Sequence, residues 1–148
     1  MDLNTARMAF GLVLSLFAFG AGCHESAHEH EGVASGATCP TTNAPDYENF
    51  GRAFMTSYCT RCHSSTLRGA NRNGASKGHD FDSSDGVLAV MDHVDQHAAA
   101  GPNGVNDEMP PSAPFPAEEE RKKLGQWLAC EQVRPDGATG SAGDATAP

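Results

Sequence analysis

Cys59-Thr60-Arg61-Cys62-His63 (CTRCH) is the stretch on which the interpretation of the fold depends. It follows a segment, 46–58, that begins just after Pro45 and in which apolar residues recur near helical spacing: Tyr47, Phe50, Phe54, Met55 and Tyr58. The sequence therefore predicts a helix over 46–58. At the end of that helix stand two thiols three positions apart and an adjacent imidazole.

Cys-x-x-Cys-His is the pattern of covalent haem c attachment. With this spacing Cys59 and Cys62 can reach the two vinyl groups on one edge of a porphyrin, and His63 can turn under the ring to ligate iron. We expect the second ring N–H of His63 to be donated to a backbone carbonyl, with the proline-rich segment near Met109 as a candidate acceptor.

Two other uses of the motif stay open. A zinc site could combine the motif with a further group such as His79, although adjacent Cys and His suit tetrahedral geometry poorly and no second ligand pair with standard spacing appears. A thioredoxin-like dithiol would need a βαβ context, which the sequence does not show.

Met109-Pro110-Pro111 lies downstream of the motif within a stretch without helical periodicity. A thioether is a soft, neutral iron ligand, and pairing His with Met raises the reduction potential of haem. Two prolines would stiffen a loop that presents one sulfur atom, so Met109 is the predicted second axial ligand. The alternatives are a methionine that fills a gap in the core, or ligation by another residue: His79, Met91, His93 or His97.

Two further helices are predicted, over 85–100, capped by Ser83 or Ser84, and over 117–132, with Glu118–Glu120 at its positive end. No strand signal competes with them. Long loops rich in Gly, Asn and Pro run over 68–84 and 101–116. Three short helices supply little apolar area, so a large apolar cofactor is expected to fill the centre.

Together these features resemble the small class I c-type cytochromes. The resemblance rests on Gly51 and Phe54 in the first helix, the CTRCH motif, Met109-Pro110, and Leu124, Trp127 and Leu128 in the last helix. It implies an all-α, cytochrome c-like fold of about three short helices and long loops around one covalent haem. It also implies crossing of the first and last helices at a small residue, here Gly51 against Trp127.

The function that this resemblance implies is single-electron transfer through an iron ligated by His63 and Met109, without enzymatic activity. A haem-bearing subunit of a larger oxidoreductase is an alternative. If Met109 is not a ligand, the open iron would suit a haem-based sensor or a peroxidase-like protein.

Three of the five cysteines lie outside the motif. If the first and last helices cross as the resemblance implies, Cys39 and Cys130 can meet and form a disulfide; two buried free cysteines are the alternative. Cys23 follows the apolar run and resembles the lipid-modified cysteine of bacterial lipoproteins.

The beginning of the chain is typical of an export signal. A polar start precedes the apolar run Met8–Gly20, which is shorter than the roughly 20 residues of a spanning helix. We therefore expect a signal peptide over 1–22, a flexible tether over 23–38, the cytochrome c domain over 39–134 and a disordered tail over 135–148. The expected location is the bacterial periplasm, with attachment to the membrane through Cys23.

The net charge of −9 leaves no electrostatic means of holding phosphate backbones, so nucleic acid is not expected as a partner. Redox partner proteins with a basic docking face are expected instead, because opposite charges speed encounter. The alternative is that the acidity only keeps the protein soluble.

Overall fold

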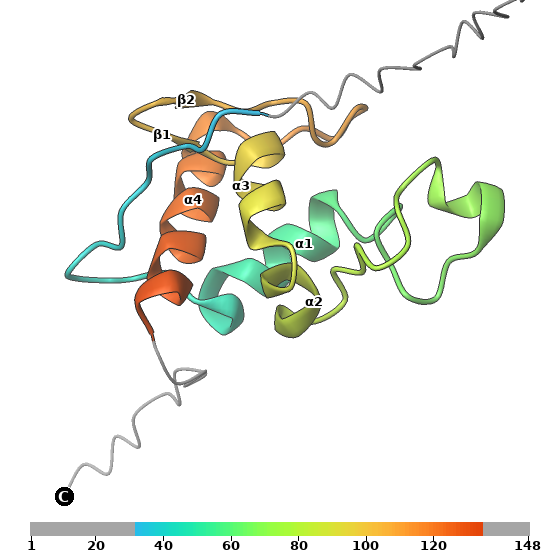
Figure 1. The fold of residues 1–148 in the computed structure, drawn as a ribbon, viewed down its shortest axis with the longest axis horizontal. Helices are drawn as coiled ribbons and strands as arrows, with labels where there is room; N and C mark the ends of the chain where they lie inside the picture. Colours follow the sequence, from blue (N-terminus) through green and yellow to red (C-terminus); the bar gives the residue numbers. More distant parts are fainter. Residues whose placement is uncertain (1–31, 135–148) are drawn as a thin grey trace, which may run out of the picture.

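The computed structural model describes residues 32–134 (Figure 1). The expected signal peptide, Cys23, most of the tether and the tail lie outside these residues. The described part is helix-rich, as the all-α expectation requires, and its elements in chain order are η1 (Tyr47–Gly51), α1 (Arg52–Tyr58), η2 (Gly69–Arg72), α2 (Ser84–Leu88), α3 (Met91–Ala98), β1 (Ala100–Gly101), β2 (Gly104–Val105) and α4 (Glu118–Val133). None of its helices is long and apolar enough to cross a membrane.

The first predicted helix is confirmed, although it opens with the π-helical turn η1 before α1. Asp46 caps it: its side chain accepts from the Asn49 amide at 2.7 Å, and the Asn49 side chain accepts from the Asp46 amide at 3.0 Å. This reciprocal pairing satisfies backbone donors that the first helical turn leaves without partners. Tyr47, Phe54 and Met55 point into the core, as their spacing predicts.

The second predicted helix, 85–100, is wrong as one continuous element. The chain forms α2, turns, and then forms α3, which ends at Ala98. Val90 marks the break, with φ −136° and ψ 32°, outside the helical region. A β-branched residue favours helix only weakly, and Val87 and Val94 on either side of the break are both buried, at 0% and 6% exposed. Ser83 is the cap, accepting from the Gly86 amide.

A short antiparallel hairpin, β1–β2, occupies part of the predicted loop 101–116, where no strand was expected. Ala100 pairs with Val105 and Gly101 with Gly104, around a Pro102-Asn103 turn. Strands of two residues are too short for an alternating pattern to reveal.

Helix α4 forms the centre of the fold, packing against β1, α3 and η1. Leu124, Trp127 and Leu128 are at most 1% exposed, which confirms their predicted inward orientation. The predicted contact of Gly51 with Trp127 is also present: a Cβ added at Gly51 would lie 2.8 Å from the indole ring. The absent side chain is what lets the two helices approach.

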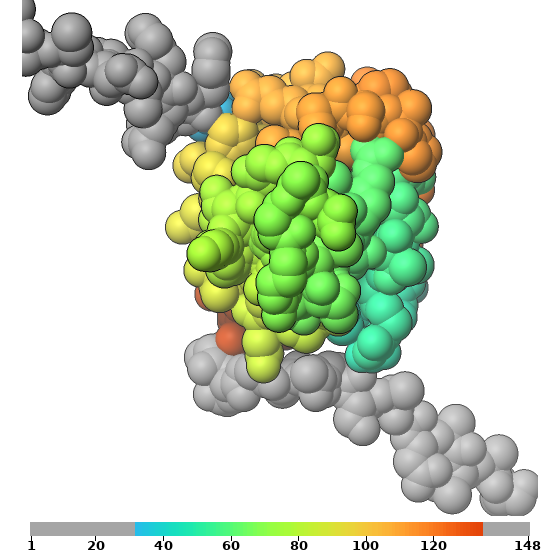
Figure 2. All heavy atoms as spheres, turned by 90° about the vertical axis from the view of Figure 1, so that its right-hand side faces the viewer, coloured from blue at the N-terminus to red at the C-terminus, as the bar shows by residue number. Residues whose placement is uncertain are grey.

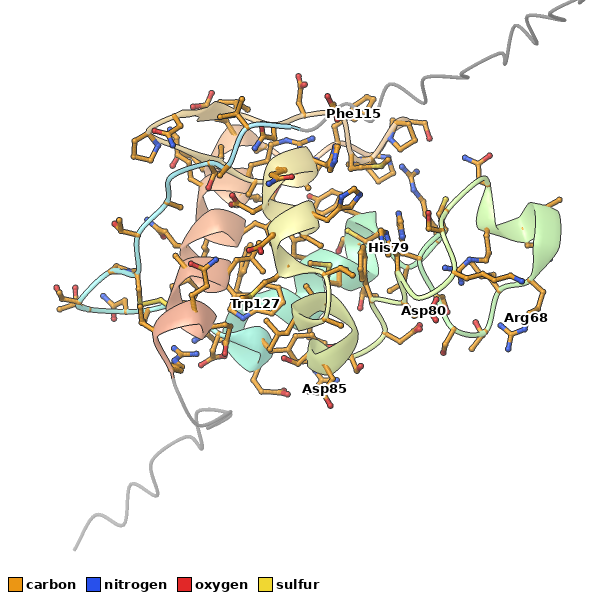
Figure 3. All side chains as sticks on the ribbon, viewed as in Figure 1. Arg68, His79, Asp80, Asp85, Phe115 and Trp127 are labelled. Carbon is orange, nitrogen blue, oxygen red and sulfur yellow. A yellow bond between two sulfur atoms is a disulfide. The ribbon has the colours of Figure 1, made fainter. Side chains whose placement is uncertain are left out.

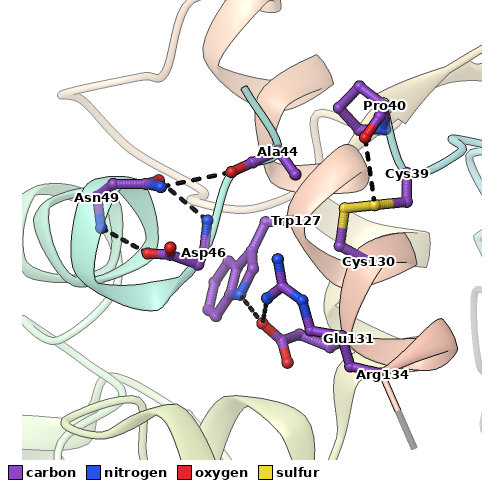
Figure 4. The surroundings of a disulfide bond; sticks show 9 residues. All are labelled: Cys39, Pro40, Ala44, Asp46, Asn49, Trp127, Cys130, Glu131 and Arg134. Carbon is purple, nitrogen blue, oxygen red and sulfur yellow. Dashed lines mark hydrogen bonds and ion pairs between the residues drawn. A yellow bond between two sulfur atoms is a disulfide. The ribbon is translucent and has the colours of Figure 1, made fainter. Parts of the chain in front are cut away.

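Cys39 and Cys130 lie at disulfide distance, with 2.00 Å between their sulfur atoms (Figure 4). This is the predicted pairing, and it ties the segment before η1 to the last turns of α4. The end of the expected tether differs from the prediction, because residues 32–38 lie against the domain. Ser35 is 1% exposed, and its amide and hydroxyl both donate to the Asp95 carboxylate, at 2.7 and 2.5 Å.

The predicted loop 68–84 extends to one side of the helices in Figure 1 and contains the 3₁₀ turn η2. In Figure 2 it covers the middle of the face, with α1 beside it and the segment after β2 above it. The core lies between the helices (Figure 3), and the loop, α1, α3 and the segment after β2 enclose a pocket at its edge.

Candidate cofactor site

The CTRCH motif continues the last turn of α1. The Cys59 and Thr60 amides donate to the Met55 carbonyl, and the Cys62 and His63 amides donate to the Cys59 carbonyl at 3.1 and 2.9 Å. Both thiols are half-buried, and neither is in a disulfide. Cys59, Cys62 and His63 all line the same pocket.

The ring of His63 is fixed by the loop that follows it. Its Nδ1 lies 3.2 Å from the His79 carbonyl oxygen, and its face stacks on Phe81 with centroids 4.6 Å apart. With Nδ1–H donated to the carbonyl, Nε2 keeps its lone pair for a metal. Burial lowers the pKa of His63 below its usual value, which favours the neutral imidazole that ligation needs.

The predicted hydrogen bond from His63 to a carbonyl is therefore present, but its acceptor was not identified from the sequence. The sequence pointed to the proline-rich segment near Met109, whereas the acceptor lies in loop 68–84. Figure 3 shows His79 on the side of this loop that faces the helices, with Arg68 at its outer end.

Arg72 holds the loop in this conformation. It is 8% exposed, its Nη1 donates to the Ser64 carbonyl and to the Asp80 carboxylate at 2.8 and 2.7 Å, and its Nη2 donates to the His79 carbonyl at 3.2 Å. A buried guanidinium with several acceptors fixes segments that no helix or strand would hold. Sequence reasoning missed Arg72, because it stands in a loop without periodicity.

The pocket has a cavity volume of about 240 Å³. Its walls come from the end of α1, residues 73–81, α3 and residues 109–111. Apart from the thiols and imidazoles, the lining is largely apolar and includes Phe81, Val94, Ala98 and Pro110. A largely apolar lining with a few polar groups is typical of small-molecule and cofactor sites.

Met109 lines the pocket across from the motif's helix end and is 40% exposed. Its amide donates to the His97 carbonyl at 2.9 Å. Of the other candidate axial ligands, His79, His93 and His97 also line the pocket, whereas Met91 packs against the hydrophobic core. The Nδ1 of His97 lies 2.5 Å from a Glu108 carboxylate oxygen.

Two arginines contact the Met109 segment, and neither was identified from the sequence. Arg61, inside the motif, donates to the Ser112 and Ala113 carbonyls. Arg121 is buried in α4 and donates to the Met109 carbonyl at 2.7 Å. A signal for Arg121 did exist: it stands three residues before Leu124 on the inward face of α4.

Among the described residues, Arg61 is the one Arg, Lys, Asp or Glu that lines the pocket. Residues 59–79 contain Arg61, Arg68, Arg72 and Lys77 and no acidic residue, and Arg72 pairs with Asp80 directly after them. Asp92 in α3 and Asp107 and Glu108 before Met109 are exposed.

Within residues 32–134, no three His, Cys, Asp or Glu side chains are arranged to hold a metal ion by themselves. The three histidines of the expected tether, His24, His28 and His30, lie outside the described residues.

No family model, curated protein or solved structure matches the chain.

Proposed function

We propose that this chain is a monohaem c-type cytochrome that carries single electrons and is not an enzyme. The observation that supports this most is the state of His63: its Nδ1 is engaged by the His79 carbonyl, its Nε2 keeps its lone pair, and two unpaired thiols stand on the same helical turn.

The residues present fit one haem c. Cys59 and Cys62 would hold it by two thioether bonds, and His63 and Met109 would ligate iron from the walls of one pocket. Haem iron with both axial positions filled supplies one-electron oxidation and reduction without binding a substrate. The fold would then be a cytochrome c-like domain, wrapped around its cofactor by loops 68–84 and 101–116.

The chain's own residues orient the donors and exclude water. Phe81 and the His79 carbonyl fix the His63 ring, so the ring would move little if an iron bound to it changed its charge. The inner wall of the pocket is apolar and excludes water. It is formed by Phe81, Val94 and Ala98, each of which is at most 6% exposed. No general base or nucleophile is needed for this function.

The same function accounts for the expected location, a periplasm reached by the signal over 1–22 and a membrane anchor at Cys23. Haem c is attached outside the cytoplasm, and a Cys39–Cys130 disulfide persists in such an oxidising compartment. The partners would be redox proteins. A basic docking face would contact exposed carboxylates such as Asp92, Asp107 and Glu108.

A haem-based sensor or peroxidase-like protein is the second candidate, favoured by the 40% exposure of Met109 and by the nearby His79, His93 and His97. A haem-bearing subunit of a larger oxidoreductase would use the same site as the free carrier, and co-purification would distinguish it.

The absorption spectrum of the ferric protein tests Met109 ligation. We expect a six-coordinate, low-spin form with the weak sulfur-to-iron band, which Met109→Ala abolishes and the control Met91→Ala retains. A high-spin ferric wild-type protein would refute the carrier function and favour the sensor or peroxidase-like alternative.

A further inference from the structure

Arg121 is a buried arginine held by carbonyl groups. Its side chain stands in the first turns of α4 and is 3% exposed. Its Nη1 lies 2.8 Å from the Ala98 carbonyl, 2.9 Å from the Asn106 carbonyl and 2.7 Å from the Met109 carbonyl. None of the ion pairs found among residues 32–134 includes it.

The three carbonyls belong to segments that meet at one wall of the pocket. Ala98 ends α3, Asn106 follows β2, and Met109 is the predicted axial ligand. One guanidinium therefore ties the ligand to the helix beside it and to the core helix α4. Hydrogen bonds from a charged, buried donor are stronger than neutral ones, and leaving their acceptors unpaired is costly.

Packing alone does not fix Met109. Its side chain is 40% exposed, and Asp107 and Glu108 before it are exposed as well. Only its backbone is tied down, by the amide that donates to the His97 carbonyl and by the carbonyl that accepts from Arg121. The position of the thioether in the pocket consequently depends on these two hydrogen bonds, together with the buried Pro110 and the contacts of Arg61 with the Ser112 and Ala113 carbonyls.

We propose that Arg121 is a positioning residue that sets how firmly Met109 occupies the iron's axial position. This inference rests on the proposed function, because it requires a haem between His63 and Met109. Without Arg121, the segment 106–109 moves away from α4 more readily, and an external ligand displaces the thioether more easily.

Imidazole affinity of the ferric protein measures this displacement. We expect Arg121→Gln and Arg121→Lys to bind imidazole at least about tenfold more tightly than the wild type. The lysine variant keeps the charge, but its side chain is one bond shorter, so its ammonium lies farther from the three carbonyls that Nη1 contacts. It therefore separates positioning from electrostatics. The control is Tyr47→Phe, which removes a side-chain hydrogen bond to the Asp82 carbonyl (3.2 Å) in another part of the core. We expect the control to keep wild-type affinity.

A second measurement needs no haem. In the haem-free chain, the Asn106 amide donates a hydrogen bond to the Ala99 carbonyl, and the Met109 amide donates one to the His97 carbonyl, both at 2.9 Å. We expect both amides to exchange hydrogen at least about tenfold faster in Arg121→Gln, and at the wild-type rate in Tyr47→Phe.

The outcomes separate this inference from the function on which it rests. A wild-type protein without the sulfur-to-iron band would refute Met109 ligation itself. A wild-type protein with the band, and unchanged imidazole affinity in both Arg121 variants, would overturn only the positioning role. Loss of helical circular dichroism in both variants would overturn it too, since Arg121 would then act on the whole fold.

Discussion

Removing the Cys39–Cys130 disulfide should lower the free energy of unfolding by several kilocalories per mole. The two cysteines are separated by 91 positions. The chain-entropy estimate for closing a loop of about 90 residues is about 4.6 kcal/mol, and native disulfides of small domains contribute about 2–5 kcal/mol. We therefore expect a loss of about 3–5 kcal/mol in the variant Cys39→Ala/Cys130→Ala.

The assay is urea denaturation followed by far-ultraviolet circular dichroism, for the wild type and the double variant, each with and without reductant. Reductant should destabilise the wild type and leave the variant unchanged. A difference between the two proteins below about 1 kcal/mol would contradict the magnitude derived from loop closure. Alkylation of Cys39 and Cys130 in unfolded, unreduced wild-type protein would contradict the bond itself.

Three further predictions concern the helix crossing, the thiols and the imidazole. Gly51→Val places a side chain against the indole ring of α4 and should lower the free energy of unfolding by about 1–3 kcal/mol in urea denaturation. The control Ala53→Val, at an exposed position, should lower it much less. Equal losses of stability in the two variants would refute the close crossing. In the haem-free chain, desolvation raises the pKa of Cys59 to about 12, so iodoacetamide should label Cys62 first, as read by peptide mass spectrometry; faster labelling of Cys59 would refute this. Burial lowers the pKa of His63, so the folded haem-free chain binds fewer protons there than the unfolded chain, and its stability should fall as the pH falls through about 6.5. His63→Asn should flatten that part of the pH profile of the free energy of unfolding, and an unchanged profile would show that His63 does not cause it.

The sequence predicted the elements with strong periodicity and local chemistry. The helix before the motif was found because its apolar residues recur at helical spacing from Tyr47 to Tyr58. The helix containing Trp127 was found from Glu118–Glu120 in its first turn and from Leu124, Trp127 and Leu128 on one face. The Gly51 contact and the Cys39–Cys130 pairing were predicted from the helix crossing that the resemblance to small c-type cytochromes implies. The break at Val90 was missed because both halves, 84–88 and 91–98, continue one apolar stripe.

Much of the site could not be predicted, because it is built from backbone carbonyls. The His79 carbonyl that orients His63 has no signature in the sequence, since every residue carries a carbonyl. Arg72 and Arg121 are ordinary basic residues until the fold buries them among such carbonyls. Sequence motifs identify side-chain chemistry, whereas the groups that position it depend on how distant segments meet.

Covalent retention of haem by the denatured chain tests the proposed function most directly. The full chain is expressed with haem-maturation machinery, unfolded, separated from free haem and weighed by mass spectrometry. We predict a mass increase of one haem in the wild type, which is absent in Cys59→Ala/Cys62→Ala. A wild-type chain that retains no haem after unfolding would contradict the proposal that this protein is a c-type cytochrome.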